Sequence, residues 1–192
     1  MKNRSLLLAP LALSGAYRIV APRYNDARGH FEVPYNRNDL AKAGITADFI
    51  QDNQSLTLKT GTVRGLHMQL PPFEQAKLVR VLRGRILDVL VDARVGSPTF
   101  GKHCTIELDT DEATQVFVPR GFLHGFVTRE PNTVVLYKVD NAYAPGQDRS
   151  LLWNDPDLNI DWGISAKDVI LSEKDRMAIR WADFVSPFRY SG

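Results

Sequence analysis

The sequence contains very little cysteine. Cys104 is the only cysteine among 192 residues, so no disulfide can form within the chain and a multi-cysteine zinc site is excluded. A reduced thiol is the usual state in the cytoplasm, and we expect a cytoplasmic protein. His103 precedes Cys104, but neighbouring residues on a strand point to opposite faces, which argues against a catalytic Cys–His pair.

The chain also lacks a long apolar run. No segment approaches the roughly 20 apolar residues that a membrane-spanning helix needs. Lys2 and Arg4 precede an apolar stretch, 6–13, that superficially resembles an export signal, but Pro10 interrupts it and no cleavage site follows. We interpret the stretch as a first strand or a dimer arm within an N-terminal arm of about residues 1–25, with export as the alternative.

An excess of charge of one sign is missing as well. The formal net charge is +2 at pH 7, and the basic residues are dispersed along the chain. The densest basic cluster, Arg80, Arg83 and Arg85, is followed closely by Asp88 and Asp92, which favours a solvated strand face over a nucleic-acid patch. We therefore expect neither nucleic acid nor a membrane as a partner.

What the chain does contain is a β-rich pattern of one-domain length. Hydrophobic residues make up 44% and charged residues 24%, and no repeat or linker divides residues 1–192. Strand-like runs separated by turns rich in Gly, Pro, Asn or Asp occupy the middle of the chain. These runs are 78–82, 85–92, 105–108, 115–118, 122–128 and 133–139. The pattern predicts a single all-β domain, a sandwich or a barrel.

Within one of these runs the apolar residues alternate with acids. Leu87, Val89 and Val91 share one parity, and Asp88 and Asp92 share the other. A strict period of two predicts a half-buried antiparallel strand with its acids in solvent.

Only two stretches favour helix. They are 38–42 and 173–184, the second within a C-terminal helical segment of about 172–186. Ser172 is a good N-cap because acids follow it in the first turn.

Two of the four histidines stand in motifs that raise the question of a metal. His67 lies in Arg64-Gly65-Leu66-His67-Met68-Gln69, so Gln69 occupies the position where a metal-binding cupin barrel has its second histidine. His124 lies in a run, 119–124, that resembles the second cupin motif. Two histidines without a thiolate or a placed carboxylate make a poor ligand set for Zn²⁺ or Fe²⁺. We predict no metal and no cofactor, with a metal-dependent cupin as the competing hypothesis.

Several polar residues lie on predicted strands with a parity that could direct them to one interior. They are His67, Gln69, Lys77, His124 and Tyr137. Taken singly, each has an ordinary structural explanation: a core histidine bonded to backbone, a surface lysine, a tyrosine at the edge of the core. Together, a base, a cation and a phenol suggest proton abstraction next to a carbonyl.

The motifs resemble the dTDP-4-dehydrorhamnose 3,5-epimerase family. The resemblance spans about residues 15 to 176 in family order. It is carried by Asp26-Ala27-Arg28-Gly29, Gln51-Asp52-Asn53, the run 64–69, Gln75-Ala76-Lys77, Ser97-Pro98-Thr99-Phe100-Gly101, the run 119–126 and Trp153-Asn154-Asp155-Pro156. Such a resemblance implies a cupin-type jelly roll, a homodimer and a metal-free site inside the barrel.

The resemblance also implies roles for individual residues. His67 would be the general base, and Asp175 would orient it, although Asp168 stands in a similar Ser-x-Lys-Asp pattern and remains an alternative. Lys77 would stabilise an oxyanion and Tyr137 would be the acid on the opposite face. The residues expected to contact the substrate are Arg28, Phe31, Gln51, Asn53, Arg64, Gln69, His124, Tyr143 and Lys174, with Arg28 and Arg64 on the diphosphate and Phe31, Gln51, Asn53 and Tyr143 towards the nucleotide.

The implied activity is epimerisation at C3 and C5 of dTDP-4-keto-6-deoxy-D-glucose, a nucleotide sugar. An epimerase acting at C3 only or C5 only, or on another nucleotide, would need the same residues and stays open. So does a non-catalytic cupin that binds sugar nucleotides, although a protein that only binds has no need of a base.

Overall fold

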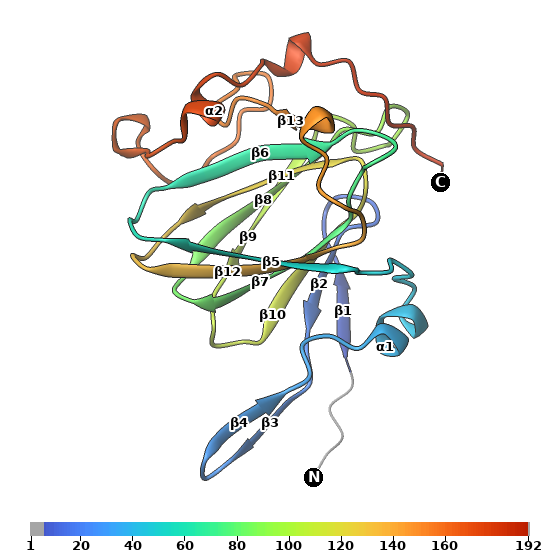
Figure 1. The fold of residues 1–192 in the computed structure, drawn as a ribbon, viewed down its shortest axis with the longest axis vertical. Coiled ribbons are helices and arrows are strands. Elements are labelled where there is room, and N and C mark those ends of the chain that lie inside the picture. Colours follow the sequence, from blue (N-terminus) through green and yellow to red (C-terminus); the bar gives the residue numbers. More distant parts are fainter. Residues whose placement is uncertain (1–5, 192) are drawn as a thin grey trace.

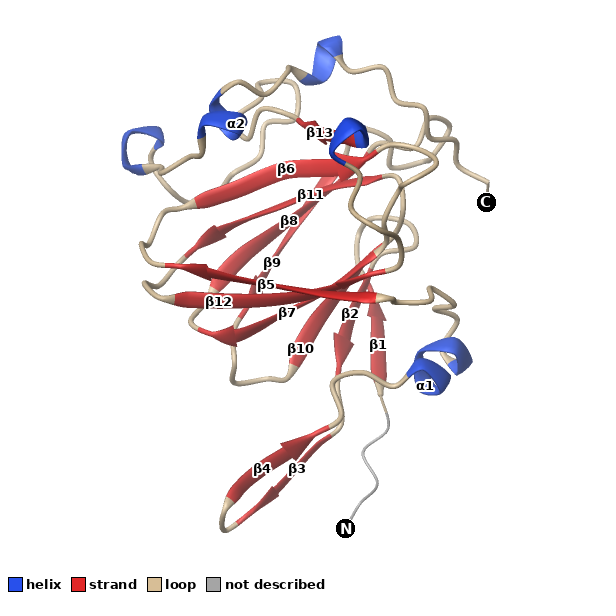
Figure 2. Cartoon of the chain, in the orientation of Figure 1, coloured by secondary structure: helices blue, strands red, loops and turns tan. Residues whose placement is uncertain are grey.

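The computed structural model describes residues 6–191 and places two β-sheets face to face (Figure 1). Helices are few and short, as Figure 2 shows. One sheet has six strands in the order β1-β2-β10-β7-β12-β5, and the other has five in the order β13-β6-β11-β8-β9. The strands of the first are β1 (Leu7–Pro10), β2 (Tyr17–Val20), β10 (Thr114–Val118), β7 (Lys77–Arg83), β12 (Thr133–Val139) and β5 (Gln51–Thr57). Those of the second are β13 (Asp148–Ser150), β6 (Val63–Gln69), β11 (Phe122–Thr128), β8 (Ile86–Asp92) and β9 (His103–Leu108). The predicted all-β jelly-roll sandwich is confirmed.

Strand β8 is more deeply buried than its alternating pattern predicts. All seven of its residues are buried, so the prediction of a half-buried strand with solvated acids is wrong. The inner face of β8 meets the six-stranded sheet, while Leu87, Val89 and Val91 pack against Trp153 and Trp162 from the C-terminal part of the chain. That segment lies over the five-stranded sheet in Figure 1 and removes the outer face of β8 from water.

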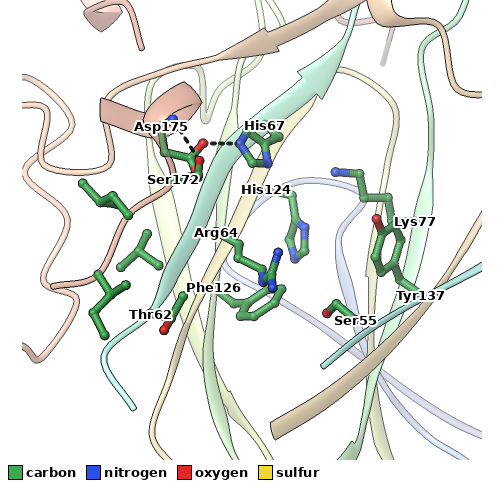
Figure 3. A pocket seen from close by; sticks show the side chains of 13 residues that line it. Ser55, Thr62, Arg64, His67, Lys77, His124, Phe126, Tyr137, Ser172 and Asp175 are labelled. Atoms are coloured by element: carbon green, nitrogen blue, oxygen red, sulfur yellow. Dashed lines mark hydrogen bonds and ion pairs between the residues drawn. The ribbon is translucent and has the colours of Figure 1, made fainter. Parts of the chain in front are cut away.

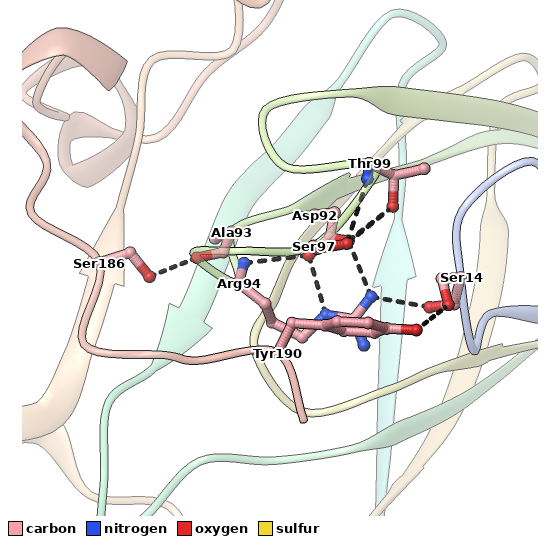
Figure 4. Close-up of polar contacts among 8 residues, drawn as sticks. All are labelled: Ser14, Asp92, Ala93, Arg94, Ser97, Thr99, Ser186 and Tyr190. Atoms are coloured by element: carbon pink, nitrogen blue, oxygen red, sulfur yellow. Dashed lines mark hydrogen bonds and ion pairs between the residues drawn. The ribbon is translucent and has the colours of Figure 1, made fainter. Parts of the chain in front are cut away.

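The acid at the end of β8 is buried in a complete set of hydrogen bonds (Figure 4). Asp92, 0% exposed, accepts from Arg94 Nε at 2.8 Å and Arg94 Nη2 at 2.7 Å, and from the hydroxyls of Ser97 at 2.6 Å and Thr99 at 2.7 Å. Burial raises the pKa of Asp92, but these hydrogen bonds outweigh burial and hold the pKa below its usual value. Arg94 also bonds to the backbone oxygen of Ser14 at 2.7 Å, so the cluster joins two loops.

The predicted C-terminal helix is wrong beyond its first turn. Helix α2 covers only Glu173–Arg176, with Ser172 as its N-cap as expected. The chain then turns away because its backbone finds partners elsewhere: Leu152 N donates to Ile179 O at 2.9 Å, and Trp181 N donates to Asp155 Oδ2 at 2.8 Å. The other short helical turns are η1 (Pro145–Gln147), η2 (Ala166–Asp168) and η3 (Trp181–Asp183).

The N-terminal part forms strands, as expected for residues 6–13, while Lys2 and Arg4 lie outside the described residues. Among residues 6–191, β1 is an edge strand of the six-stranded sheet. After β2 the chain makes a hairpin, β3 (Arg23–Asp26) and β4 (Gly29–Glu32), which stands away from both sheets in Figure 1. Helix α1 (Arg37–Lys42) agrees with the predicted 38–42, and Leu40 inserts into a core cluster with Ile19. None of the helices within residues 6–191 has the length and apolar character to cross a bilayer.

Candidate active site

The interior between the two sheets is hollow at one end. A cavity of about 430 Å³ is adjoined by an annex of about 330 Å³, and His67, Lys77 and Tyr137 line both. The main cavity is further lined by Arg64, His124, Phe126 and Asp175, and the annex by Gln51, Asn53, Gln69 and Tyr143. Polar residues from both sheets thus reach one shared space.

A histidine–carboxylate pair lies on one side of this cavity (Figure 3). His67 on β6 bonds through Nε2 to Asp175 Oδ1 at 2.5 Å, and Ser172 Oγ donates to Asp175 Oδ2 at 2.9 Å. Asp175 is 3% exposed, and although burial raises its pKa, the hydrogen bonds from His67 and Ser172 bring that pKa below its usual value. Asp168 is exposed in η2 and makes no contact with His67. Of the two candidate aspartates, the structure pairs Asp175 with the histidine.

The opposite side of the cavity belongs to the six-stranded sheet. Lys77 on β7 and Tyr137 on β12 extend into the space across from His67, as Figure 3 shows. Burial lowers the pKa of Lys77 to about 8, even though Asp88 and Asp148 act in the opposite direction. Burial also raises the pKa of the Tyr137 phenol. At neutral pH the cavity therefore presents an ammonium and a protonated phenol facing an imidazole.

A second histidine is bound to a carboxylate deeper in the interior. His124 on β11 is 6% exposed and bonds through Nε2 to Asp88 Oδ1 at 2.7 Å. Burial lowers the pKa of His124, and the charge of Asp88 opposes this only in part, so the imidazole is neutral at pH 7. His124 is paired across the strands with His67, which brings the two imidazoles to the same wall.

Four of the remaining predicted residues line the main cavity or the annex. Arg64 lines the main cavity, and its Nε donates to Thr57 Oγ1 at 3.1 Å. Gln51 and Asn53 lie side by side on β5, joined by a hydrogen bond of 2.7 Å, and line the annex. Gln69 is buried, and both of its amide hydrogens go to backbone oxygens, of Phe73 and Ala142. Its side chain therefore joins two loops at the wall of the annex, and the contact with substrate stays a prediction.

The carboxylate of Asp148, which lines the annex, contacts two of the predicted residues. Tyr143 Oη donates to Asp148 Oδ2 at 3.1 Å, and Lys174 forms an ion pair with the same carboxylate. Asp148 was not among the predicted site residues.

Arg28 and Phe31 lie outside the cavity of their own chain. Arg28 is at the tip of the hairpin, its side chain 90% exposed and paired with Asp26. Phe31 is 67% exposed on β4. Neither lines the main cavity or the annex.

Sequence reasoning also missed Asp88 and Ser55, and gave Ser172 only its capping role. Ser172 has a detectable signal, since its capping motif is the one that carries Asp175. Asp88 looked like a solvated acid because its strand alternates, but in the structure it lies on the face of β8 that meets the six-stranded sheet. No group of three or more His, Cys, Asp or Glu side chains in the described part of the chain is arranged to hold a metal ion.

Comparison with known proteins gives a consistent result. The sequence model of the dTDP-4-dehydrorhamnose 3,5-epimerase family matches residues 10–183. A dTDP-4-dehydrorhamnose 3,5-epimerase of Sinorhizobium fredii is 42% identical over 174 residues, which is 90% of this chain and 89% of that protein. The crystal structure of the enzyme of that name from Elizabethkingia anophelis superposes with a TM-score of 0.89 at 42% identity and covers 94% of this chain and 98% of that one. A 3,5-epimerase from Legionella pneumophila, in complex with dTDP-4-keto-L-rhamnose, has a TM-score of 0.92 at 34% identity and covers 97% and 100%.

Fold and cavity together define a jelly-roll protein with acid–base groups on opposite walls of its interior. Within that class, the chain belongs to the dTDP-4-dehydrorhamnose 3,5-epimerase family.

Proposed function

We propose that the protein epimerises dTDP-4-keto-6-deoxy-D-glucose at C3 and C5. The observation that carries the proposal is the presence of His67 with Asp175 on one wall of the cavity and of Lys77 and Tyr137 on the other. The protons at C3 and C5 both flank the C4 ketone, so removal of either one leaves an enolate whose charge lies on O4. One set of groups can therefore serve both carbons.

His67 is the base in this proposal. A neutral imidazole takes the proton from C3 or C5, and Asp175 fixes the ring and stabilises the imidazolium that forms. The oxyanion at O4 is stabilised by the ammonium of Lys77, which acts where charge develops. Inversion requires the proton to return from the other face of the ring, and Tyr137 donates it from the opposite wall. The electron pair left on carbon is held by the substrate's own ketone until Tyr137 protonates that carbon.

The diphosphate and the nucleotide of the substrate have candidate contacts as well. Arg64 offers a guanidinium to the diphosphate, and the amides of Gln51 and Asn53 offer donors and acceptors in the annex. Lys174 adds a second cation at the annex mouth, where Asp148 now holds it. Tyr143 is the aromatic group on the nucleotide side.

A homodimer belongs to the same proposal. Arg28 and Phe31 are expected to contact substrate, yet they are exposed on a hairpin that stands away from their own cavity. A second copy whose cavity receives this hairpin would give both residues a function. The open edge of β1 and the exposed Leu56 and Leu82 on the six-stranded sheet supply further surface for such a contact. We place this dimer in the cytoplasm because the lone Cys104 needs no oxidising compartment.

The test of the activity is the configuration of the product. Purified protein is incubated with dTDP-4-keto-6-deoxy-D-glucose, the product is trapped by reduction of the ketone, and the sugar is analysed by NMR. The proposal predicts inversion at C3 and C5. Inversion at one carbon only would replace it with a single-site epimerase, and no inversion would refute it. Elemental analysis of the same protein tests the metal-dependent hypothesis, which requires stoichiometric bound metal.

The dimer has its own test in mixed samples. Light scattering first measures the mass of the wild-type protein, which should be twice that of the chain. Arg28→Ala and His67→Ala variants, each nearly inactive, are then unfolded together and refolded. If the hairpin of one copy serves the other's cavity, a mixed dimer holds one intact site and activity returns. Recovery no greater than the sum of the two variants would contradict a shared site.

A further inference from the structure

One buried side-chain amide is bonded to the backbone of two turns. Gln69 is the last residue of β6 and is 6% exposed. Its Nε2 donates to Phe73 O at 2.7 Å and to Ala142 O at 3.0 Å, and its Oε1 accepts from Ala144 N at 2.7 Å. Both amide hydrogens and the amide oxygen therefore bind backbone, and removal of the amide would leave three backbone groups without these partners.

Two of these hydrogen bonds flank a single aromatic residue. Ala142 directly precedes Tyr143 and Ala144 directly follows it, in a stretch between β12 and η1 that belongs to no strand. The start of the same stretch is bound as well, because Gln75 Nε2 donates to Asn141 O at 2.7 Å. Side chains from β6 and from the turn before β7 thus hold the backbone around the aromatic ring.

The aromatic ring lies on the nucleotide side of the proposed substrate. Tyr143 is 59% exposed, lines the annex and donates through Oη to Asp148 Oδ2 at 3.1 Å. Residues in loops are usually mobile, and ordering such a residue when a ligand binds costs free energy. A ring that is held before the ligand arrives avoids this cost, and its flat face suits a nucleobase. The bonds on either side of Tyr143 should therefore strengthen the binding of a nucleotide.

We propose that Gln69 is a positioning residue for the nucleotide: it binds the backbone on either side of Tyr143 and so holds the ring at the wall of the annex, where it stacks on the base. The inference rests on the proposed function, because it requires a nucleotide-linked substrate. In this role Gln69 acts through Tyr143 and needs no contact with the substrate.

The test is a double-mutant cycle with dTDP as the ligand, measured by isothermal titration calorimetry. Gln69→Met keeps the length of the side chain and removes all three hydrogen bonds, whereas Tyr143→Ala removes the ring. Each single variant should bind dTDP about tenfold more weakly, within the range for the loss of one base–aromatic stack. The double variant should bind no more weakly than Tyr143→Ala, because the position of residues 141–144 has no effect on binding once the ring is gone.

Two results of this cycle would overturn the proposal. An unchanged affinity in folded Gln69→Met would mean that the ring does not depend on the amide. A loss of about a hundredfold in the double variant, the product of two independent losses, would mean that Gln69 binds the nucleotide without acting through Tyr143.

A matched control separates positioning from simple destabilisation. Thr133 is 0% exposed at the other end of β12, and its Oγ1 donates to the backbone oxygen of Glu130 at 2.8 Å. Thr133→Val removes this buried bond to backbone at a residue that lines neither the main cavity nor the annex. The substitution should lower stability in urea and leave the affinity for dTDP at the wild-type value. An equal loss of affinity in Thr133→Val would contradict a specific role of Gln69.

A second measurement uses the wild-type protein and does not depend on the folding of a variant. Hydrogen exchange of the Ala144 amide, followed by NMR, reports whether this N–H is bonded before any ligand is present. Slow exchange in the free protein supports the proposal, and exchange at the rate of an unbonded amide overturns it. Failure of the proposed function gives a different result, since the wild-type protein would then show no deuterium uptake from D₂O at C3 and C5 of the keto-sugar.

Discussion

Asp88 and Asp92 lie on one strand, four residues apart, on the same inner face and equally buried. Asp92 is surrounded by donors from Arg94, Ser97 and Thr99, which fully satisfy it. Asp88 has one donor, His124, and an oxygen that has no hydrogen-bond partner within residues 6–191. The difference shows how one fold separates two uses of a buried acid. The carboxylate of Asp92 belongs to a cluster that joins two loops, and the carboxylate of Asp88 holds a histidine of the cavity wall.

We expect the largest effect from the substitution of a residue that lines the cavity. His67→Ala removes the base, and deuterium uptake at C3 and C5 should fall by roughly 10²–10⁴, the usual contribution of a general base. His103→Ala is the matched control, since His103 lies on β9 and lines neither the main cavity nor the annex. Its uptake rate should equal that of the wild type. Undiminished uptake in His67→Ala would remove His67 from the role of base.

Substitution of Asp92 should lower the free energy of unfolding and leave the rate of deuterium uptake unchanged. Asp92→Ala leaves the guanidinium of Arg94 buried without its partner, and we expect the free energy of unfolding to fall by roughly 3–5 kcal/mol. Urea denaturation measures this loss. The uptake rate per folded molecule should remain that of the wild type, because no atom of this cluster lines the cavity wall occupied by His67. A strong loss of rate in folded protein would break the comparison between the two aspartates.

Tyr137→Phe distinguishes taking a proton from returning it. The base is intact, so exchange from the face of His67 continues, while inversion should fall by about a hundredfold for want of the acid. Parallel assays of uptake and of product configuration measure the two processes. Equal losses in both would mean that Tyr137 does not act as the donor to the opposite face.

The smallest effect is the dependence on pH. Activity requires the protonated form of Lys77, whose pKa burial lowers to about 8. The rate should therefore be highest below this value and decrease as the pH rises through it, approaching a tenfold loss for each further unit. Asp92→Asn should not move this limit, whereas Asp88→Asn should shift it to lower pH. A change of the pH profile in Asp88→Asn alone would support different roles for the two aspartates.

Much of the site could be predicted from the sequence because strands impose parity. His67, Lys77, His124 and Tyr137 lie on β6, β7, β11 and β12 with their side chains directed inward, as strand alternation predicts. The roles given to them stay predictions. Asp175 was within reach of sequence reasoning because a capping serine places it on the first turn of a helix.

The predictions that were wrong concern contacts between segments that are distant in the sequence. The helix predicted over 173–184 ends at Arg176, because the backbone around Ile179 and Trp181 bonds to residues 150–155. The solvation predicted for Asp88 was wrong because the acids of β8 face the six-stranded sheet, while residues 151–188 cover the apolar face of the strand. The exposure of Arg28 could not be foreseen either, since strand pattern does not say whether a hairpin folds back on its own chain.

The most direct measurement is the position of solvent deuterium in the sugar after incubation of the wild-type protein with dTDP-4-keto-6-deoxy-D-glucose in D₂O. Deuterium is predicted at C3 and C5, the two carbons beside the ketone, and not at C2, whose proton has no ketone next to it. A sugar that carries no deuterium at either C3 or C5 would contradict the assignment of proton-transfer chemistry to this cavity.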